Sequence, residues 1–202
     1  MSTRRGNVKF LDDILADVRE VMHEVMRRND AKYSQVENPE MVADILGISA
    51  VMVQDMSGKR VNDYPFDLAR MTSFEGDTGP YLQYANARLC SIARKANIPV
   101  EELEKADFSL LREPHAVDLI RLMALYPEMV AQTLKTLEPT TILTYLFRLT
   151  HQLSSSYDVL NVIRAPSREI GVARAALYTC AKQVISNGLR LLGLTPVERY
   201  AL

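Results

Sequence analysis

Tyr81, Tyr84 and Arg88 combine residue types and a spacing that could hold unpaired nucleotides. On a helix they lie at i, i+3 and i+7, so all three side chains project from one face. Phenol rings can stack with unpaired bases, and a guanidinium can pair with a phosphate. The alternative is a half-buried helix whose tyrosines pack into a core, and the spacing alone favours this alternative.

The helix that must carry these side chains has a well-defined predicted start. Asp77 or Thr78 can cap it, and Pro80 suits its first turn because the missing N–H would be unpaired there anyway. The periodicity continues and predicts a helix over residues 80–96. The glycine-bearing residues 75–79 are therefore predicted to form a loop beside the tyrosine-bearing face.

Helical periodicity dominates the other segments as well. Further helices are predicted to begin at Pro114, Pro127 and Pro139, and a long helix is predicted over residues 168–192 with Gly193 as its stop. Residues 49–53 fit either a helix or a strand. Thr195 and Pro196 predict one last short turn near the end of the chain.

Composition indicates an ordinary globular chain with a real core, since 48% of its 202 residues are hydrophobic and 24% are charged. The fold class is therefore predicted to be mainly α: a small, mostly helical connecting segment over residues 1–75 precedes a helical bundle over residues 76–202. Cys90 and Cys180 fall on helical apolar patterns and are predicted as reduced core residues. His151 lies on a strongly apolar predicted helix, which favours a packed or hydrogen-bonded histidine over a metal ligand.

Four stretches of the chain together resemble the C-terminal part of eukaryotic arginyl-tRNA synthetases. They are MSTRRGNVKFLDDIL at the start, FEGDTGPYLQYANARL at residues 74–89, EPTTILTYLFRLTHQLSSSYDVL at 138–160 and NGLRLLGLTPVER at 187–199. GDTGPYLQYA and LLGLTPVER are highly specific in combination, and the resemblance covers essentially the whole chain. No HIGH-type motif is present, so the chain resembles the part of such an enzyme that begins at its KMSKS-like loop.

The resemblance implies a DALR-type helical bundle that grips the anticodon loop of arginine tRNA. The positions that match tRNA contacts of the family are Asp77, Thr78, Tyr81, Tyr84, Arg88, Tyr157 and Tyr200. Tyr157 follows three serines at which the predicted helix frays, so its ring is expected to face an open cleft together with Tyr81 and Tyr84. Tyr200 departs from the family pattern, which commonly has a methionine followed by the terminal carboxylate.

Arg4 and Arg5, in the KMSKS-like loop, are the only candidates for catalysis. In class I synthetases, cationic side chains of this loop stabilise charge on the leaving pyrophosphate. The resemblance implies ATP with Mg²⁺ for the full enzyme, and the catalytic domain of that enzyme as a partner. Neither a cofactor nor a metal is expected for this chain, which alone should bind tRNA without catalysis.

Charge argues against a general nucleic-acid binder, because the net charge is −1 and the isoelectric point is near 6.3. Its distribution is uneven, however: residues 140–202 hold seven basic and three acidic residues, against 17 and 22 in residues 1–139. The chain has neither a signal-peptide pattern nor a membrane-length apolar run, so a cytoplasmic protein without a membrane or DNA partner is expected. The alternative function is a free-standing, synthetase-derived protein that binds tRNA or scaffolds other proteins.

Overall fold

The computed structural model describes residues 9–199, apart from the side chain of Lys32, and within this range it contains helices but no strand. The longer helices are α1 (Leu11–Arg27), α3 (Pro39–Met56), α5 (Gly79–Ala96), α7 (Pro114–Ala124), α8 (Tyr126–Thr136), α9 (Thr140–Ser156) and α10 (Arg168–Leu191). Short helices are α2 (Asp30–Tyr33), α4 (Leu68–Met71), α6 (Val100–Leu103) and the 3₁₀ turn η2 (Phe108–Leu110). The predicted mainly α fold is confirmed.

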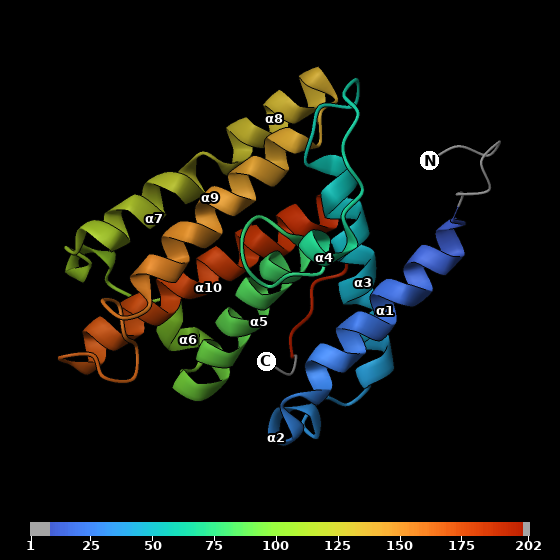
Figure 1. The fold of residues 1–202 in the computed structure, drawn as a ribbon. Coiled ribbons are helices and arrows are strands. Elements are labelled where there is room, and N and C mark those ends of the chain that lie inside the picture. The colour runs from blue at the N-terminus through green and yellow to red at the C-terminus, as the bar shows by residue number, and fades with distance from the viewer. Residues whose placement is uncertain (1–8, 200–202) are drawn as a thin grey trace.

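Helices α5, α9 and α10 form the centre of the bundle, and α7 and α8 pack on the outer side of α9 (Figure 1). The main core lies between these helices and includes Leu82 of α5, Leu146 and Leu149 of α9 and Leu177 of α10, each 0% exposed. Gly188 of α10 faces Leu146, where an added Cβ would come within 2.6 Å of the leucine side chain. Helices α9 and α10 therefore approach each other closely at this point.

The N-terminal helices α1 and α3 form a second layer, which packs against α5 through α3. Gly79 marks the contact between α3 and α5, because a Cβ at this position would lie 2.1 Å from the backbone oxygen of Ser49. A second apolar cluster holds Met22 and Leu46 together with Val197 from the end of the chain. The segment before α5 is thus in direct contact with the bundle.

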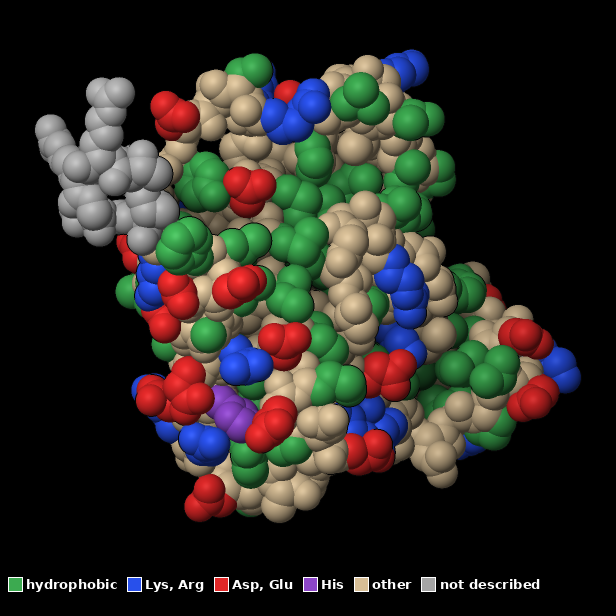
Figure 2. All heavy atoms as spheres, turned by 90° about the vertical axis from the view of Figure 1, so that its right-hand side faces the viewer, with side chains coloured by type: hydrophobic (Ala, Val, Ile, Leu, Met, Phe, Trp, Pro, Cys, Tyr) green, Lys and Arg blue, Asp and Glu red, His purple; other side chains and the backbone are tan. Residues whose placement is uncertain are grey.

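The face on the α1 side of the molecule carries acidic and basic side chains interspersed among hydrophobic ones (Figure 2). Neither sign of charge dominates this face in the part of the chain that is described. Among residues 9–199, no helix combines the length and the apolar character needed to span a bilayer.

Three local predictions are settled by the structure. Residues 49–53 lie within α3 and are helical. The predicted short turn at Thr195 and Pro196 is wrong, because residues 194–197 have no helical structure and this part of the chain is held by side chains of α5. The prediction for the cysteines holds for Cys90, which is buried, but is wrong for Cys180, which lies on the outer face of α10.

Candidate nucleic-acid interface

Helix α5 is preceded by a loop that ends at Thr78 and is closed by a hydrogen bond between Thr78 and Ser73. Thr78, and not Asp77, is the N-cap: its Oγ1 accepts a hydrogen bond from the backbone N–H of Tyr81 at 3.2 Å. The same hydroxyl donates to the carbonyl of Ser73 at 2.6 Å, and Gly76 takes a left-handed φ of 79° that suits glycine. Thr78 is therefore buried, whereas Asp77 projects from the loop and is exposed.

The predicted face of α5 exists: Tyr81, Tyr84 and Arg88 lie along one side of this helix, and all three are half-buried. The guanidinium carbon of Arg88 lies 3.9 Å from the centre of the Tyr157 ring, which is a cation–π contact. Burial raises the pKa of Tyr157, and Tyr84 and Tyr81 lie near enough to add to this rise when they are ionised. The structure thus brings these four predicted site residues together.

The expectation that Tyr157 exposes its ring is wrong. Helix α9 does not fray at the three serines but continues to Ser156, whose hydroxyl lies 3.1 Å from that of Tyr178 in α10. Tyr157 packs in the same place, with its ring 5.7 Å from the Tyr178 ring and only 9% of the residue exposed. Arg88 covers one face of this ring.

The hydroxyl of Tyr157 is buried and has no hydrogen-bond partner among the described residues. Burial raises the pKa of this phenol, and the nearby Arg88 guanidinium opposes that rise only in part. An unpaired buried hydroxyl is rare in folded proteins and is destabilising. Tyr157 therefore holds an unused donor next to the outward face of α5.

A pocket of about 280 Å³ adjoins this cluster, between the second half of α5 and the segment that follows α9. Two cationic side chains, Arg88 and Lys95, line it on the α5 side, and Tyr157, the acidic Asp158 and Asn161 line it on the other, so the lining has an excess of positive charge that Asp158 reduces. Flat apolar surface, amide groups and positive charge are the features by which proteins hold unpaired nucleotides. The pocket extends the predicted face of α5 toward the C-terminal end of that helix.

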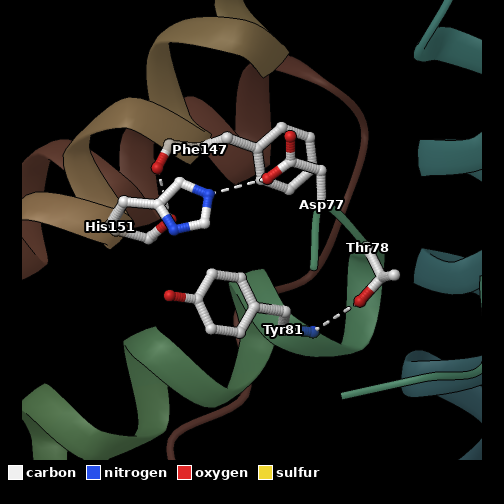
Figure 3. Close-up of polar contacts among 6 residues, drawn as sticks. Asp77, Thr78, Tyr81, Phe147 and His151 are labelled. Atoms are coloured by element: carbon white, nitrogen blue, oxygen red, sulfur yellow. Dashed lines mark hydrogen bonds and ion pairs between the residues drawn. The ribbon is translucent and has the colours of Figure 1, made fainter. Parts of the chain in front are cut away.

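His151 joins the site from α9, on the side of Tyr81 (Figure 3). Its Nε2 lies 2.8 Å from the Oδ1 of Asp77, and its ring centre lies 5.5 Å from that of Tyr81. The prediction of a hydrogen-bonded histidine is confirmed, although this residue is not packed into the core. The imidazole lies at the surface, with 54% of the side chain exposed.

Sequence reasoning missed Gln83 and Asn86, two fully buried amides on the opposite side of α5. Gln83 donates to the carbonyl of Thr195 and accepts from the backbone N–H of Val197, both at 2.9 Å. Asn86 donates to the carbonyl of Val197 at 2.9 Å and accepts from the hydroxyl of Ser186 at 2.9 Å. The signal for this role was an i, i+3 pair of amides among apolar residues, which is a costly arrangement unless the amides are hydrogen-bonded.

These amides hold the end of the chain alongside α5, and Arg94 adds a 3.2 Å hydrogen bond to the carbonyl of Glu198. Three predicted site residues, Arg4, Arg5 and Tyr200, lie outside the described residues. Among residues 9–199, no group of three or more histidine, cysteine, aspartate or glutamate side chains could hold a metal ion.

Comparisons with known proteins identify the family to which this chain is similar. The model of the DALR anticodon binding domain matches residues 82–200, and that of the class I tRNA synthetase (R) catalytic domain matches residues 1–68. The cytoplasmic arginine–tRNA ligase of Saccharomyces cerevisiae is 60% identical over 98% of this chain, and the probable cytoplasmic enzyme of Schizosaccharomyces pombe is 55% identical over 98%. The chain spans about a third of the length of these relatives, 33% and 32%.

Solved structures agree at the level of the fold. The arginyl-tRNA synthetase of Thermus thermophilus matches 95% of this chain with a TM-score of 0.86 at 24% identity, over 32% of its own length. That of Plasmodium falciparum matches 94% with a TM-score of 0.82 at 23% identity, over 33% of its length. Nothing in these comparisons favours the protein-scaffold alternative. The chain therefore belongs to the arginyl-tRNA synthetase family and carries its DALR anticodon-binding domain.

Proposed function

We propose that this chain holds the anticodon loop of arginine tRNA against the outward face of α5. The observation that carries the proposal is the cluster formed by Tyr81, Tyr84, Arg88 and Tyr157, next to a pocket of about 280 Å³. Anticodon bases are unpaired, and proteins recognise such bases by stacking and by contacts to their edges. The relatives' names, which specify arginine–tRNA ligases, indicate which tRNA to test.

Each predicted contact has its own role in this proposal. The half-buried rings of Tyr81 and Tyr84 can contribute stacking surface on this face, and the carboxylate of exposed Asp77 can accept hydrogen bonds from base amino groups. Thr78 acts indirectly, because its hydroxyl is occupied by the N-cap and by Ser73. Arg88 pairs with a phosphate once it leaves the Tyr157 ring, and a base then stacks on this ring in the place of Arg88.

Charge contributes less than the composition of residues 140–202 indicates. Arg174 is 7% exposed and pairs with Glu113 at 2.6 Å, and Arg168 pairs with Glu102 at 2.7 Å. These two guanidinium groups are already neutralised. We therefore expect only a few phosphate contacts and a modest dependence of affinity on salt.

The activity of a whole enzyme is a further step of the proposal. In a complete arginine–tRNA ligase, the loop that contains Arg4 and Arg5 would stabilise pyrophosphate charge while ATP, with Mg²⁺, activates arginine. The 202-residue chain alone should bind tRNA and show no arginine-dependent pyrophosphate exchange. We propose that the protein acts in the cytoplasm, which the names of the two relatives above support.

Fluorescence titration of a labelled anticodon stem-loop of arginine tRNA into the 202-residue chain tests the proposal. We expect a stem-loop with a different anticodon to bind more weakly, and Tyr84→Ala to weaken binding about 10-fold or more, the loss of one stacked base. Tyr126→Ala is the matched control, because Tyr126 is also half-buried but lies at the start of α8. Equal affinity for both stem-loops, or equal losses in both variants, would refute the proposal.

A further inference from the structure

His151 and Asp77 form a contact between two parts of the chain that are 74 residues apart. The Nε2 of His151 lies 2.8 Å from the carboxylate of Asp77, which joins the loop before α5 to the middle of α9 (Figure 3). An ionised carboxylate only accepts hydrogen bonds, so Nε2 carries the proton and donates it. The contact lies at the surface, since 54% of the His151 and 59% of the Asp77 side chain are exposed.

The same imidazole lies beside the first tyrosine of the site. Its ring centre is 5.5 Å from that of Tyr81, and the two ring planes are inclined by 32°, within the range of offset aromatic pairs. His151 therefore contacts both the loop before α5 and the outward face of α5. A histidine that served only the core would be buried, whereas this one and its partner Asp77 are both exposed.

Local hydrogen bonds shape the loop of residues 73–78 but do not tie its tip to α9. Ser73 accepts from the backbone N–H of Glu75 at 3.0 Å, and Thr78 donates to the carbonyl of Ser73 at 2.6 Å. Gly76, at the centre of the loop, has a positive φ and an open environment with no atom within 4 Å of an added Cβ. The His151 contact thus restrains the loop at a point where its own hydrogen bonds do not.

We propose that His151 is a positioning residue for RNA binding, which holds Asp77 and the Tyr81 ring in their binding geometry before the nucleic acid arrives. The inference rests on the proposed function. The apparent affinity is proportional to the fraction of molecules in the binding-competent geometry. A residue that restrains the loop in this geometry therefore raises the affinity without contacting RNA. His151 acts through Asp77 and Tyr81 and does not itself contact a nucleotide.

Titration of the anticodon stem-loop into five variants of the full chain tests this role. His151→Ala should weaken binding about two- to fivefold, the range in which an exposed ion pair contributes. His151→Gln should recover most of the loss, because its amide can still donate to Asp77. His115→Ala is the matched control, because it replaces a partly exposed histidine at the start of α7, a helix that packs against α8, α9 and α10, and it should leave affinity unchanged.

The double variant Asp77→Ala/His151→Ala separates positioning from direct contact. Because His151 acts through Asp77 as well as through Tyr81, replacing it should weaken binding less in the Asp77→Ala background than in the wild type. Losses that multiply would mean that His151 acts independently of Asp77, and would overturn the inference. Amide NMR shifts of Gly76 and Gly79 in the free protein give a second readout, which should change in His151→Ala and return in His151→Gln.

Three further results are decisive. Unchanged affinity and unchanged loop shifts in His151→Ala, with a wild-type chain that binds, would overturn the inference and leave the proposed function standing. A wild-type chain that does not bind the stem-loop would refute the proposed function, and this inference would fall with it. A large drop in the melting temperature of His151→Ala, with unchanged binding per folded molecule, would assign His151 to stability alone.

Discussion

Replacing Tyr157 by phenylalanine should stabilise the free protein, although it removes a polar group from the predicted site. The Tyr157 hydroxyl is buried without a hydrogen-bond partner, and the residue is 9% exposed. An unpaired buried hydroxyl costs about 1–3 kcal/mol, while the ring contacts with Tyr178 and Arg88 survive the change. We expect the free energy of unfolding to rise by about 1 kcal/mol, or about 2–4 °C in melting temperature.

Tyr145→Phe is the matched control, because Tyr145 is equally buried but its hydroxyl has a partner. Tyr145 is 3% exposed and donates to the carbonyl of Leu122 at 3.0 Å. Its replacement should cost about 1 kcal/mol, the net contribution of one hydrogen bond. The two tyrosine-to-phenylalanine changes should therefore shift stability in opposite directions.

Tyr157→Ala completes the series, because it removes the ring as well as the hydroxyl. Truncating a buried aromatic side chain costs about 3–5 kcal/mol through lost burial and the cavity that remains. Urea unfolding followed by circular dichroism measures all three variants, and stem-loop titration of the folded fraction measures binding. Destabilisation of Tyr157→Phe by 1 kcal/mol or more, or a Tyr157→Ala cost of under about 1 kcal/mol, would refute the assigned burial.

Three other predictions concern the elements that support the site. Gly79→Ala should lower the free energy of unfolding in urea by about 2 kcal/mol or more, because its Cβ would lie 2.1 Å from the Ser49 carbonyl oxygen. Gly58→Ala, with no atom within 4 Å of the added Cβ, should be neutral. Equal effects would contradict the close approach of α3 and α5. Gln83→Leu should expose the amide of residue 197 to faster hydrogen exchange and cost about 1–3 kcal/mol, because a buried N–H loses its acceptor; unchanged exchange would exclude this anchor. Burial raises the pKa of Tyr145 from 10.0 to about 12, so stability should be intact below pH 10 and fall as the pH rises toward 12, which circular dichroism with phenolate absorbance can follow; stability that is flat over this range would contradict the burial.

The start and the outward face of α5 could be predicted because both depend on residues close together in the chain. A cap at Asp77 or Thr78, a proline at position 80 and the i, i+3, i+7 spacing act within one or two helical turns, and the structure has the helix where they predict it, with Thr78 as the cap. The helices that begin near Pro114, Pro127 and Pro139 follow the same local rule. The resemblance in four stretches also identified the family, which the comparisons confirm.

The environment of each side chain depended instead on how the helices pack. Tyr157 was expected at an open surface, yet α9 continues past the serines and turns its ring toward Tyr178, 21 residues further along the chain. Gln83 meets the carbonyl of Thr195 across 112 residues, and His151 meets Asp77 across 74. Helical periodicity determines which residues share a face of a helix. What lies against that face depends on the packing of helices that are distant in sequence. Only the tertiary structure therefore decided which polar groups are paired and which, like the Tyr157 hydroxyl, are not.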